Sequence, residues 1–335
     1  MTVLKKILKS TLSILLTVLI ICTVAIAAVW LIIAQPTAEK NSPSRVKIDT
    51  KRLERHVRKL SEEFHPRDYR NVKNLNRTAD YIIDHFKRAG ARAVHFQEFE
   101  EQGKNYKNVI ARFGTEVGER IVIGAHYDTV IDTPGADDNA SGVAGLIELA
   151  YLLGKNPING NIELVAYTLE EPPFFGTNHM GSAKHAESLA SQLIPVKLMI
   201  SLEMIGFFTD EENSQIFPMP LLSLIYPEKG NYIVIVSGFD QRKITKKVKV
   251  SMRGTTNLPV HSINAPSIIA GIDFSDHRNY WNNGYKAVMI TDTSFYRNRA
   301  YHRNNDTADR LNYASMAKVV VGVFETIKTL NENKI

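Results

Sequence analysis

Ile121-Val-Ile-Gly-Ala-His-Tyr-Asp128 is the stretch that decides the fold. Its first residues are apolar and β-branched, which predicts a short buried strand. His126 and Asp128, two residue types that bind metals, follow where that strand ends. In open α/β sheets, ligands bind beyond the carboxyl ends of the strands. The stretch therefore predicts a functional site at such an edge.

Apolar runs and helical periodicity alternate along the rest of the chain. Further strands are expected at 162–167, 198–202, 233–236 and 287–290, and helices at 50–64, 74–90, 142–153 and 314–330. Strands that alternate with helices indicate an α/β fold, here a three-layer α/β/α sandwich with a mixed, mostly parallel central sheet. No internal repeat is found, so residues 46–335 are interpreted as one domain.

The amino-terminal part carries a charge-free, largely apolar segment at 11–34. It is long enough to span a bilayer core of about 30 Å as a helix. Three lysines precede it, so the positive-inside rule places residues 1–10 in the cytoplasm and the domain at 46–335 on the extracytoplasmic side. A cleaved signal peptide is the alternative, although its apolar core is usually about 7–15 residues long. We expect an uncleaved, single-pass transmembrane signal anchor, followed by a tether at 35–45.

Composition excludes several other chemistries. The chain of 335 residues has a formal net charge of +6, with its basic residues scattered. The densest basic cluster outside the amino terminus, at 243–249, is interpreted as a solvated face, and no nucleic-acid-binding module accompanies it. The single cysteine, Cys22, lies in the apolar segment, so neither a disulfide framework nor a thiolate metal site is expected. Any metal must be bound by His, Asp and Glu.

Residue types that bind metals gather at the ends of three successive predicted strands, in the turn before the 142–153 helix and in one late loop. Each alone has an ordinary explanation, such as a helix cap or a solvated pair of carboxylates. Together, and without cysteine, they indicate a zinc site with nitrogen and oxygen ligands. The residues are His126, Asp128, Glu170, Glu171, Glu203 and His302, with Asp137, Asp138 and Asn139 in the turn.

The spacing within these motifs suggests a division of roles. Residues two apart on an extended chain face the same way, so Asp128 can accept the second ring N–H of His126. In Glu170-Glu171, one carboxylate can bind metal while its neighbour takes a proton from metal-bound water. Pro172 follows directly and should hold Glu171 in an extended conformation.

An ordered set of these motifs resembles the co-catalytic zinc aminopeptidases, the group that also holds glutamate carboxypeptidase and glutaminyl cyclase. The resemblance covers most of residues 50–330. The matching stretches are Gly124–Asp128, Pro134–Gly142, Leu169–Glu171, Ser201–Gly206, Ser275–His277 and Tyr301-His302.

The resemblance implies a centre of two Zn²⁺ ions, with other divalent metals as alternatives. Asp138 would bridge both ions, His126 and Glu203 would complete one site, and Glu171 and His302 would complete the other. Glu203 departs from the family pattern, where Asp is more common; its longer side chain changes the reach of the carboxylate.

The same resemblance implies roles for residues around the metals. Glu170 would be the general base, and Tyr301 matches a position whose hydroxyl can stabilise the tetrahedral oxyanion. Asp128 would support His126, and the Asp138–Asn139 peptide bond would be cis. Asp276-His277 is interpreted as part of the wall of the site.

These inferences predict a membrane-anchored metallopeptidase that hydrolyses the peptide bond next to a free amino terminus, using metal-activated water. One alternative is a glutaminyl cyclase-like acyltransferase with a single zinc ion, and a count of metal ions per chain distinguishes it. A second is an inactive membrane receptor or scaffold on the same fold. That alternative predicts a metal-replete protein without activity on a broad panel of peptides.

Overall fold

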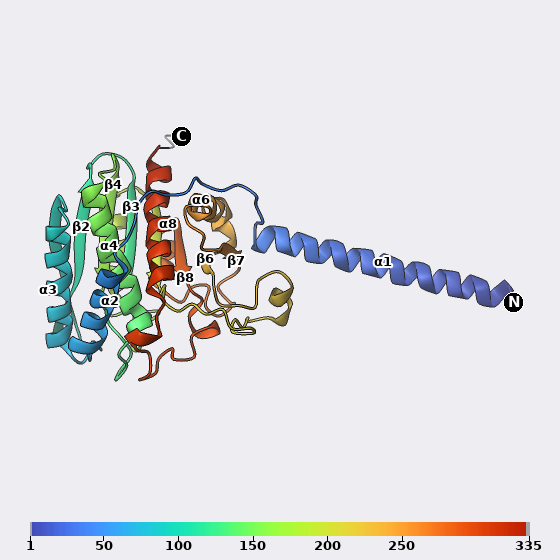
Figure 1. Ribbon diagram of the computed structural model, residues 1–335, viewed down its shortest axis with the longest axis horizontal. Coiled ribbons are helices and arrows are strands. Elements are labelled where there is room, and N and C mark those ends of the chain that lie inside the picture. The colour runs from blue at the N-terminus through green and yellow to red at the C-terminus, as the bar shows by residue number, and fades with distance from the viewer. Residues whose placement is uncertain (1, 333–335) are drawn as a thin grey trace.

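The computed structural model describes residues 2–332. Met1 and residues 333–335, which belong to the predicted ranges 1–10 and 46–335, lie outside the described residues. A long helix, α1 (Thr2–Ile33), projects away from a three-layer domain (Figure 1). By length and composition, its segment Lys5–Ile33 could cross a membrane, and none of its most apolar stretch is buried against the domain.

The described residues form an eight-stranded sheet in the order β1-β2-β4-β3-β5-β8-β6-β7. Its middle strands β4, β3, β5 and β8 run parallel. β2 and β6 flank this group and are antiparallel to β4 and β8, respectively. The predicted mixed, mostly parallel sheet is therefore confirmed. The strands are β1 (Ala93–Glu101), β2 (Lys104–Gly114), β3 (Arg120–His126), β4 (Asn161–Tyr167), β5 (Val196–Glu203), β6 (Ile233–Ser237), β7 (Val260–Asn264) and β8 (Ala287–Thr291).

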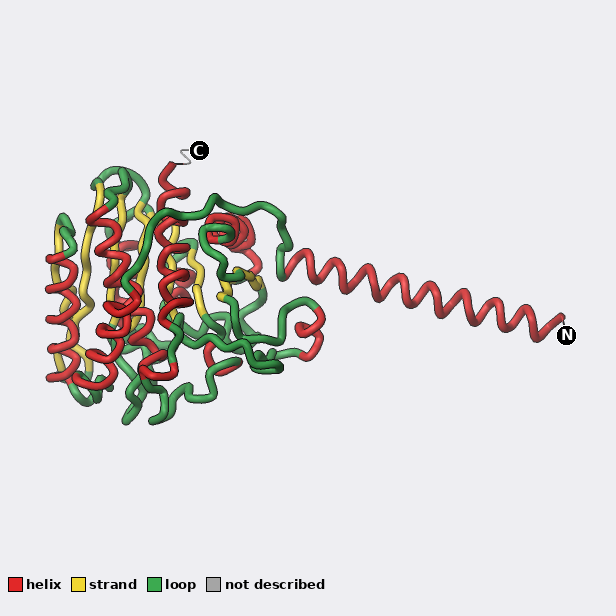
Figure 2. Tube along the Cα trace, viewed as in Figure 1, coloured by secondary structure: helices red, strands yellow, loops and turns green. Residues whose placement is uncertain are grey.

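Helices cover both faces of the sheet (Figures 1 and 2). One layer contains α2 (Thr50–Arg58), α3 (Val72–Arg88), α4 (Gly142–Lys155), α6 (Arg242–Met252) and α8 (Tyr313–Glu332), and the other contains α5 (Gly181–Ser191) and α7 (His277–Asn282). The predicted helices and strands are present, with ends shifted by a few residues. The first predicted helix ends as an α-helix at Arg58 and continues as a π-helical turn over Lys59–Glu63.

Strand β3 shows why the middle of the sheet is so apolar. All seven of its residues are buried. Ile121 and Ile123 pack into the layer that contains α4 and α8, while Val122 packs against the layer of α5 and α7. Because both faces are covered, the strand is a continuous apolar run rather than an alternating one. That burial fixes the position of His126 at the end of the strand.

The segment predicted as a tether, 35–45, lies along the surface of the domain. The backbone N–H of Asn41 donates to the carbonyl of Arg253 at 2.7 Å, and that of Ser44 donates to the carbonyl of Thr255 at 2.9 Å. These contacts connect the end of α1 to the loop after α6.

A buried carboxylate, Glu163, lies in β4 on the face toward α5. Arg112 Nε and Arg120 Nη1 each donate to Glu163 Oε2 at 2.9 Å, and His185 Nε2 lies 3.3 Å from Oε1. Burial alone would raise the pKa of Glu163, but the hydrogen bond from His185 and the charges of His185 and Arg120 outweigh it and lower the pKa to about 2. The folded state therefore favours the charged carboxylate.

We expect Glu163→Gln to lower the free energy of unfolding by about 3–5 kcal/mol at neutral pH, because Arg120 would be left buried without its counter-charge. A carboxyl whose pKa is depressed by folding stabilises the protein above its unfolded pKa, 4.5 for glutamate, and loses that contribution as pH falls toward 2. The difference in the free energy of unfolding between wild type and variant should therefore become smaller in acid. Urea unfolding across this pH range measures it.

The matched control is Glu116→Gln, whose carboxylate pairs with Arg92 and is 74% exposed. An exposed pair contributes about 0–1 kcal/mol, so this variant should unfold almost as the wild type does. Equal losses of unfolding free energy in the two variants would contradict the role given to Glu163.

Candidate metal centre

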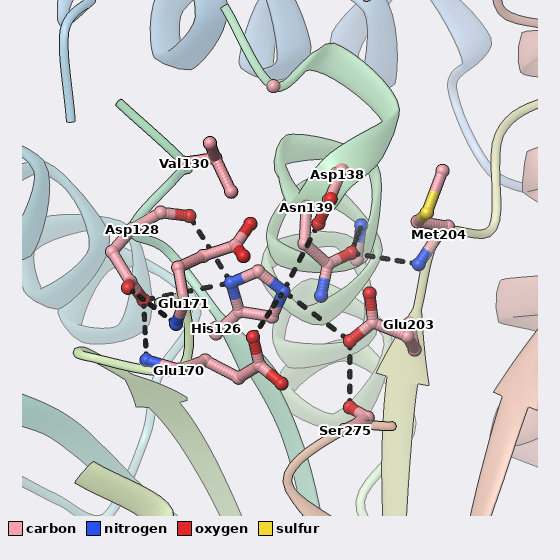
Figure 3. A network of polar contacts seen from close by, with 12 residues as sticks. His126, Asp128, Val130, Asp138, Asn139, Glu170, Glu171, Glu203, Met204 and Ser275 are labelled. Atoms are coloured by element: carbon pink, nitrogen blue, oxygen red, sulfur yellow. Dashed lines mark hydrogen bonds and ion pairs between the residues drawn. The ribbon is translucent and has the colours of Figure 1, made fainter. Parts of the chain in front are cut away.

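His126 is the last residue of β3 and is 1% exposed. Its Nδ1 lies 3.2 Å from the carbonyl oxygen of Asp128, which assigns the ring proton to Nδ1 and leaves the lone pair on Nε2. Nε2 has no hydrogen-bond partner among residues 2–332. One oxygen each of Asp138 and Glu203 lies 3.4 Å from it (Figure 3). A buried lone pair that faces two carboxylates suits a bound cation.

Asp138 lies between two such groups. Its Oδ1 lies 3.4 Å from His126 Nε2, and its Oδ2 lies 3.2 Å from His302 Nε2. A second carboxylate accompanies each histidine: Glu203 lies beside His126, and Glu171 Oε2 lies 3.3 Å from His302 Nε2. The residues thus form two adjoining sets of nitrogen and oxygen donors that share one carboxylate.

The backbone before α4 is held so that Asp138 points into the centre. The carboxylate of Asp306 accepts the N–H groups of Asp137 at 3.1 Å and of Asp138 at 3.0 Å. Gly135 has a φ of 59°, and a Cβ there would meet the carbonyl oxygen of Asp138 at 2.3 Å. Only glycine fits this left-handed turn at such a close approach.

Asn139 connects this turn to the end of β5. The Asp138–Asn139 peptide bond is cis, as the resemblance implies. The Asn139 side chain donates to the carbonyl of Leu202 at 2.8 Å and accepts the N–H groups of Gly142 and Met204 at 3.1 Å (Figure 3). These bonds keep Asp138 and Glu203 at a constant separation.

The Asp128 carboxylate contacts the glutamate pair more closely than it contacts His126. It accepts the backbone N–H of Glu170 at 3.2 Å and that of Glu171 at 3.1 Å. Its Oδ1 lies 3.6 Å from His126 Nδ1, while the Asp128 carbonyl takes the shorter contact. The sequence predicted that the Asp128 carboxylate accepts the second ring N–H of His126. In the structure that contact is 3.6 Å long, and the hydrogen bonds of the carboxylate fix the turn after β4.

Sequence reasoning missed several residues that position the centre. Ser275 Oγ donates to Glu203 Oε2 at 2.7 Å and lies 2.9 Å from Ser201 Oγ. Asp306 comes from a loop far along the chain. The serine appeared only as a member of a family motif, and no local pattern identifies the aspartate. The predicted wall residue His277 is buried, with Nε2 2.8 Å from the carbonyl of Ile272.

Glu170 and Tyr301 lie at the edge of a cavity of about 440 Å³ that begins at the centre. Glu170 Oε2 is 3.9 Å from His126 Nε2. The Tyr301 ring stacks on His302 with centroids 3.7 Å apart. Away from the centre the cavity is walled mainly by apolar and aromatic side chains, among them Phe175, Phe217, Leu222, Tyr226, Ile263 and Phe274.

Burial of several carboxylates makes the centre electrostatically costly. Burial, reinforced by the charge of Asp138, raises the pKa of Glu171 to about 8. It also raises the pKa of Glu170 well above its usual range, and that of Glu203. For Asp138 burial acts in the same sense, but the adjacent imidazoles of His126 and His302 outweigh it and hold the pKa below its usual range. Bound cations would offset this concentration of negative charge.

These observations fit a metal centre. His126, Asp138 and Glu171 each place a ligand atom within 4.8 Å of the others. Imidazole nitrogen and carboxylate oxygen are donors that zinc accepts, and the unpaired His126 Nε2 lies where a ligand atom is needed. An α/β sheet with such a centre at the carboxyl ends of its strands defines the class of metal-dependent hydrolases.

Comparison with known proteins identifies the family. Residues 108–327 match the model of Peptidase family M28. The chain is 50% identical over 279 residues to Uncharacterized protein YfbL of Escherichia coli, covering 81% of this chain and 85% of that protein. It is 26% identical to Probable aminopeptidase YDR415C of Saccharomyces cerevisiae, covering 68% of this chain but only 58% of that protein. The chain belongs to peptidase family M28, the family of co-catalytic zinc aminopeptidases.

A solved structure supports the fold independently. BSAP, a zinc aminopeptidase from Bacillus subtilis, superposes with a TM-score of 0.67. The match covers 86% of this chain and 97% of that chain at 12% sequence identity. At this identity the likeness concerns the fold alone.

We expect a chelator to lower the midpoint of thermal unfolding by about 5 °C or more, because the repulsion among the buried carboxylates would no longer be offset. Added zinc should restore the midpoint. Circular dichroism melts, combined with the metal content of the same samples, measure both effects. In Asp138→Asn the metal content and the response to chelator should both fall.

Asp210→Asn is the matched control, because Asp210 is exposed and belongs to neither set of donors. It should keep the metal content and the chelator response of the wild type. A wild type that loses all metal without any change in its melting curve would contradict the stabilising role of the cations.

Proposed function

We propose that this protein is a membrane-anchored aminopeptidase that binds two zinc ions. The observation that carries the proposal is the Asp138 carboxylate, which directs one oxygen to His126 and the other to His302. A single-zinc cyclase needs no carboxylate shared between two complete donor sets. The geometry therefore favours two ions over one.

In this proposal, His126, Asp138 and Glu203 hold one ion, and Asp138, Glu171 and His302 hold the other. When bound, the ions supply a water of lowered pKa and polarise the substrate carbonyl. Ser275 orients Glu203 through its hydrogen bond of 2.7 Å.

Glu170 is proposed as the general base. The residue is 5% exposed at the edge of the cavity, and its backbone N–H donates to the Asp128 carboxylate, which fixes its backbone. Its raised pKa suits a group that takes a proton from water and then delivers it to the leaving amine. Burial also raises the pKa of Tyr301 far above its usual range, so its hydroxyl stays protonated and can donate to the developing oxyanion.

The preference for a free amino terminus is inferred from the family and from the residues of the site. The unprotonated amine of such a substrate would bind one of the metal ions, and the apolar cavity beside the centre can receive the side chain of an amino-terminal residue. Peptides with a free amino terminus are accordingly the proposed substrates.

Contacts at the end of α1 support an uncleaved anchor. The carbonyl of Ile33 accepts from Asn264 Nδ2 at 3.1 Å, and that of Ala34 accepts from Lys249 Nζ at 2.7 Å and from Ser262 Oγ at 3.0 Å. Cleavage after Ala34 would remove α1 and disrupt these hydrogen bonds, and it would expose the side chains that donate them. With lysines before the helix, the catalytic domain is proposed to face the extracytoplasmic side. A mature chain that begins near residue 35 would contradict this proposal.

Glu170→Gln is expected to lower kcat by about 10²–10⁴-fold, because the amide cannot accept the proton of the attacking water. Metal content should remain that of the wild type, since no proposed ligand changes. Initial rates on an aminoacyl amide, with metal analysis of each sample, measure this. Glu98→Gln, at an exposed position of β1, is the control and should retain full activity. A Glu170→Gln variant that keeps both its metal and its full rate would exclude the base assignment.

Leucine amides with a free amine should be hydrolysed at least about 100-fold faster than their amino-acetylated forms, because acetylation removes the amine lone pair that a metal ion would bind. The comparison of kcat/KM for the two substrates measures the effect. Equal hydrolysis of both would exclude an aminopeptidase. A peptide with amino-terminal glutamine belongs in the same assay, because cyclisation without hydrolysis would support the cyclase alternative.

A further inference from the structure

The end of α1 is fixed to the catalytic domain without a free linker. The carbonyls of its last residues bond to the side chains of Ser262 and Asn264 on β7, and Ala34 is 5% exposed. If α1 spans a bilayer, as proposed above, the membrane surface must lie next to the part of the domain that surrounds these contacts. The side chains exposed there are therefore informative.

Large exposed apolar side chains gather around this point. Within the described residues 46–332, nine large apolar side chains are exposed in all: Val117, Leu193, Ile216, Met219, Leu221, Leu224, Phe239, Ile268 and Phe274. Five of these nine, Ile216 to Leu224 and Phe239, belong to two segments that contact the end of α1. Soluble surfaces carry such residues singly, so a group around one helix end points to an interaction surface.

The first segment contains the short 3₁₀ helix Pro220–Leu224. Leu222 on its inner side is buried and packs in one cluster with Ala34 and Tyr226. Leu221 and Leu224 are instead 49% and 67% exposed. Figure 1 shows this olive-yellow segment beside the base of α1.

The second segment contains Phe239, which is 44% exposed. It lies just before α6, where the side chain of Gln35 donates to the carbonyl of Arg242 at 3.0 Å. Lys243, the next residue, is exposed. An exposed aromatic ring beside basic side chains suits the boundary between lipid headgroups and acyl chains, where anionic headgroups attract the bases.

We propose that Leu221, Leu224 and Phe239 form a membrane collar, which inserts into the lipid interface on the catalytic side of the bilayer, next to α1. A bilayer fits this surface because the collar surrounds the end of a helix that would itself be immersed in lipid. The same 3₁₀ helix supplies Leu222 to the wall of the cavity. Insertion of the collar would thus also hold one wall of the cavity.

The test uses the full chain in vesicles of phosphatidylcholine and phosphatidylglycerol. Cys22→Ser removes the single native cysteine. Single cysteines then replace Leu224, Phe239, Val117 or Val18, and each carries an environment-sensitive fluorophore. Lipids that bear a nitroxide at the headgroup boundary quench probes at that depth, and lipids that bear it along the acyl chain quench a probe at position 18 within the core. A water-soluble quencher reports exposure to solvent.

Val117 is the matched control, because it is also apolar and 82% exposed. It follows β2, six strand positions from β7 in the sheet order, which corresponds to about 29 Å. If the fluorophore itself binds lipid and thereby brings an exposed site into the membrane, it would have the same effect at position 117. Circular dichroism confirms that each variant folds.

The proposal predicts a loss of emission with nitroxide lipids at 224 and 239, and none at 117, with a blue shift at the first two positions. Loss of emission at 18 but not at 224 and 239 would overturn the collar and leave the anchor intact. Protection of 224 from the aqueous quencher without quenching by lipid would indicate a second protein molecule and would also overturn it. No quenching at 18 would contradict the anchor itself, and the collar with it.

Discussion

The shared carboxylate of Asp138 is the constraint on which the rest of the centre depends. Its two oxygens face His126 and His302, which lie in segments 176 residues apart in the sequence, at the end of β3 and in the loop after β8. Neither histidine alone defines a centre. Because Asp138 lies between them, both segments must approach the turn before α4. Hydrogen bonds of Asp306 and Asn139 hold that turn in place.

Such a concentration of buried carboxylates is tolerated because the surrounding groups supply donors and positive charge. The guanidinium of Arg67 is buried behind the turn and donates to the carbonyls of Tyr127, Pro134 and Gly135, thereby linking the end of β3 to the turn before α4. Its charge also lies near Asp138 and Asp306. Backbone N–H groups neutralise part of the charge on Asp128 and Asp306. The centre is therefore preorganised by hydrogen bonds, and cations would complete a charge balance that the protein leaves negative.

The sequence predicted the middle of the fold well, because strands buried on both faces are continuous apolar runs. It did not predict β1, β2 or β7. β1 alternates charged and apolar residues at half-buried positions, β2 begins with a polar stretch at 104–108, and β7 is a short strand with polar residues. The residues proposed as ligands could be found because they follow predicted strands or occur in motifs. Asp306 could not, since its bond to Asp138 spans 168 positions and depends on the complete tertiary structure.

The same limit applies to α1, whose composition indicates a membrane span but not its attachment to the domain. β7 is the edge strand of the sheet, and an edge presents unpaired backbone groups unless something covers it. The end of α1 lies against β7 and also packs Ala34 onto Leu222, which faces the cavity on its other side. A shift at the base of the helix therefore reaches the cavity wall through a single layer of side chains. On this geometry the helix is a structural part of the catalytic domain, and its attachment bears on the shape of the space beside the metal centre.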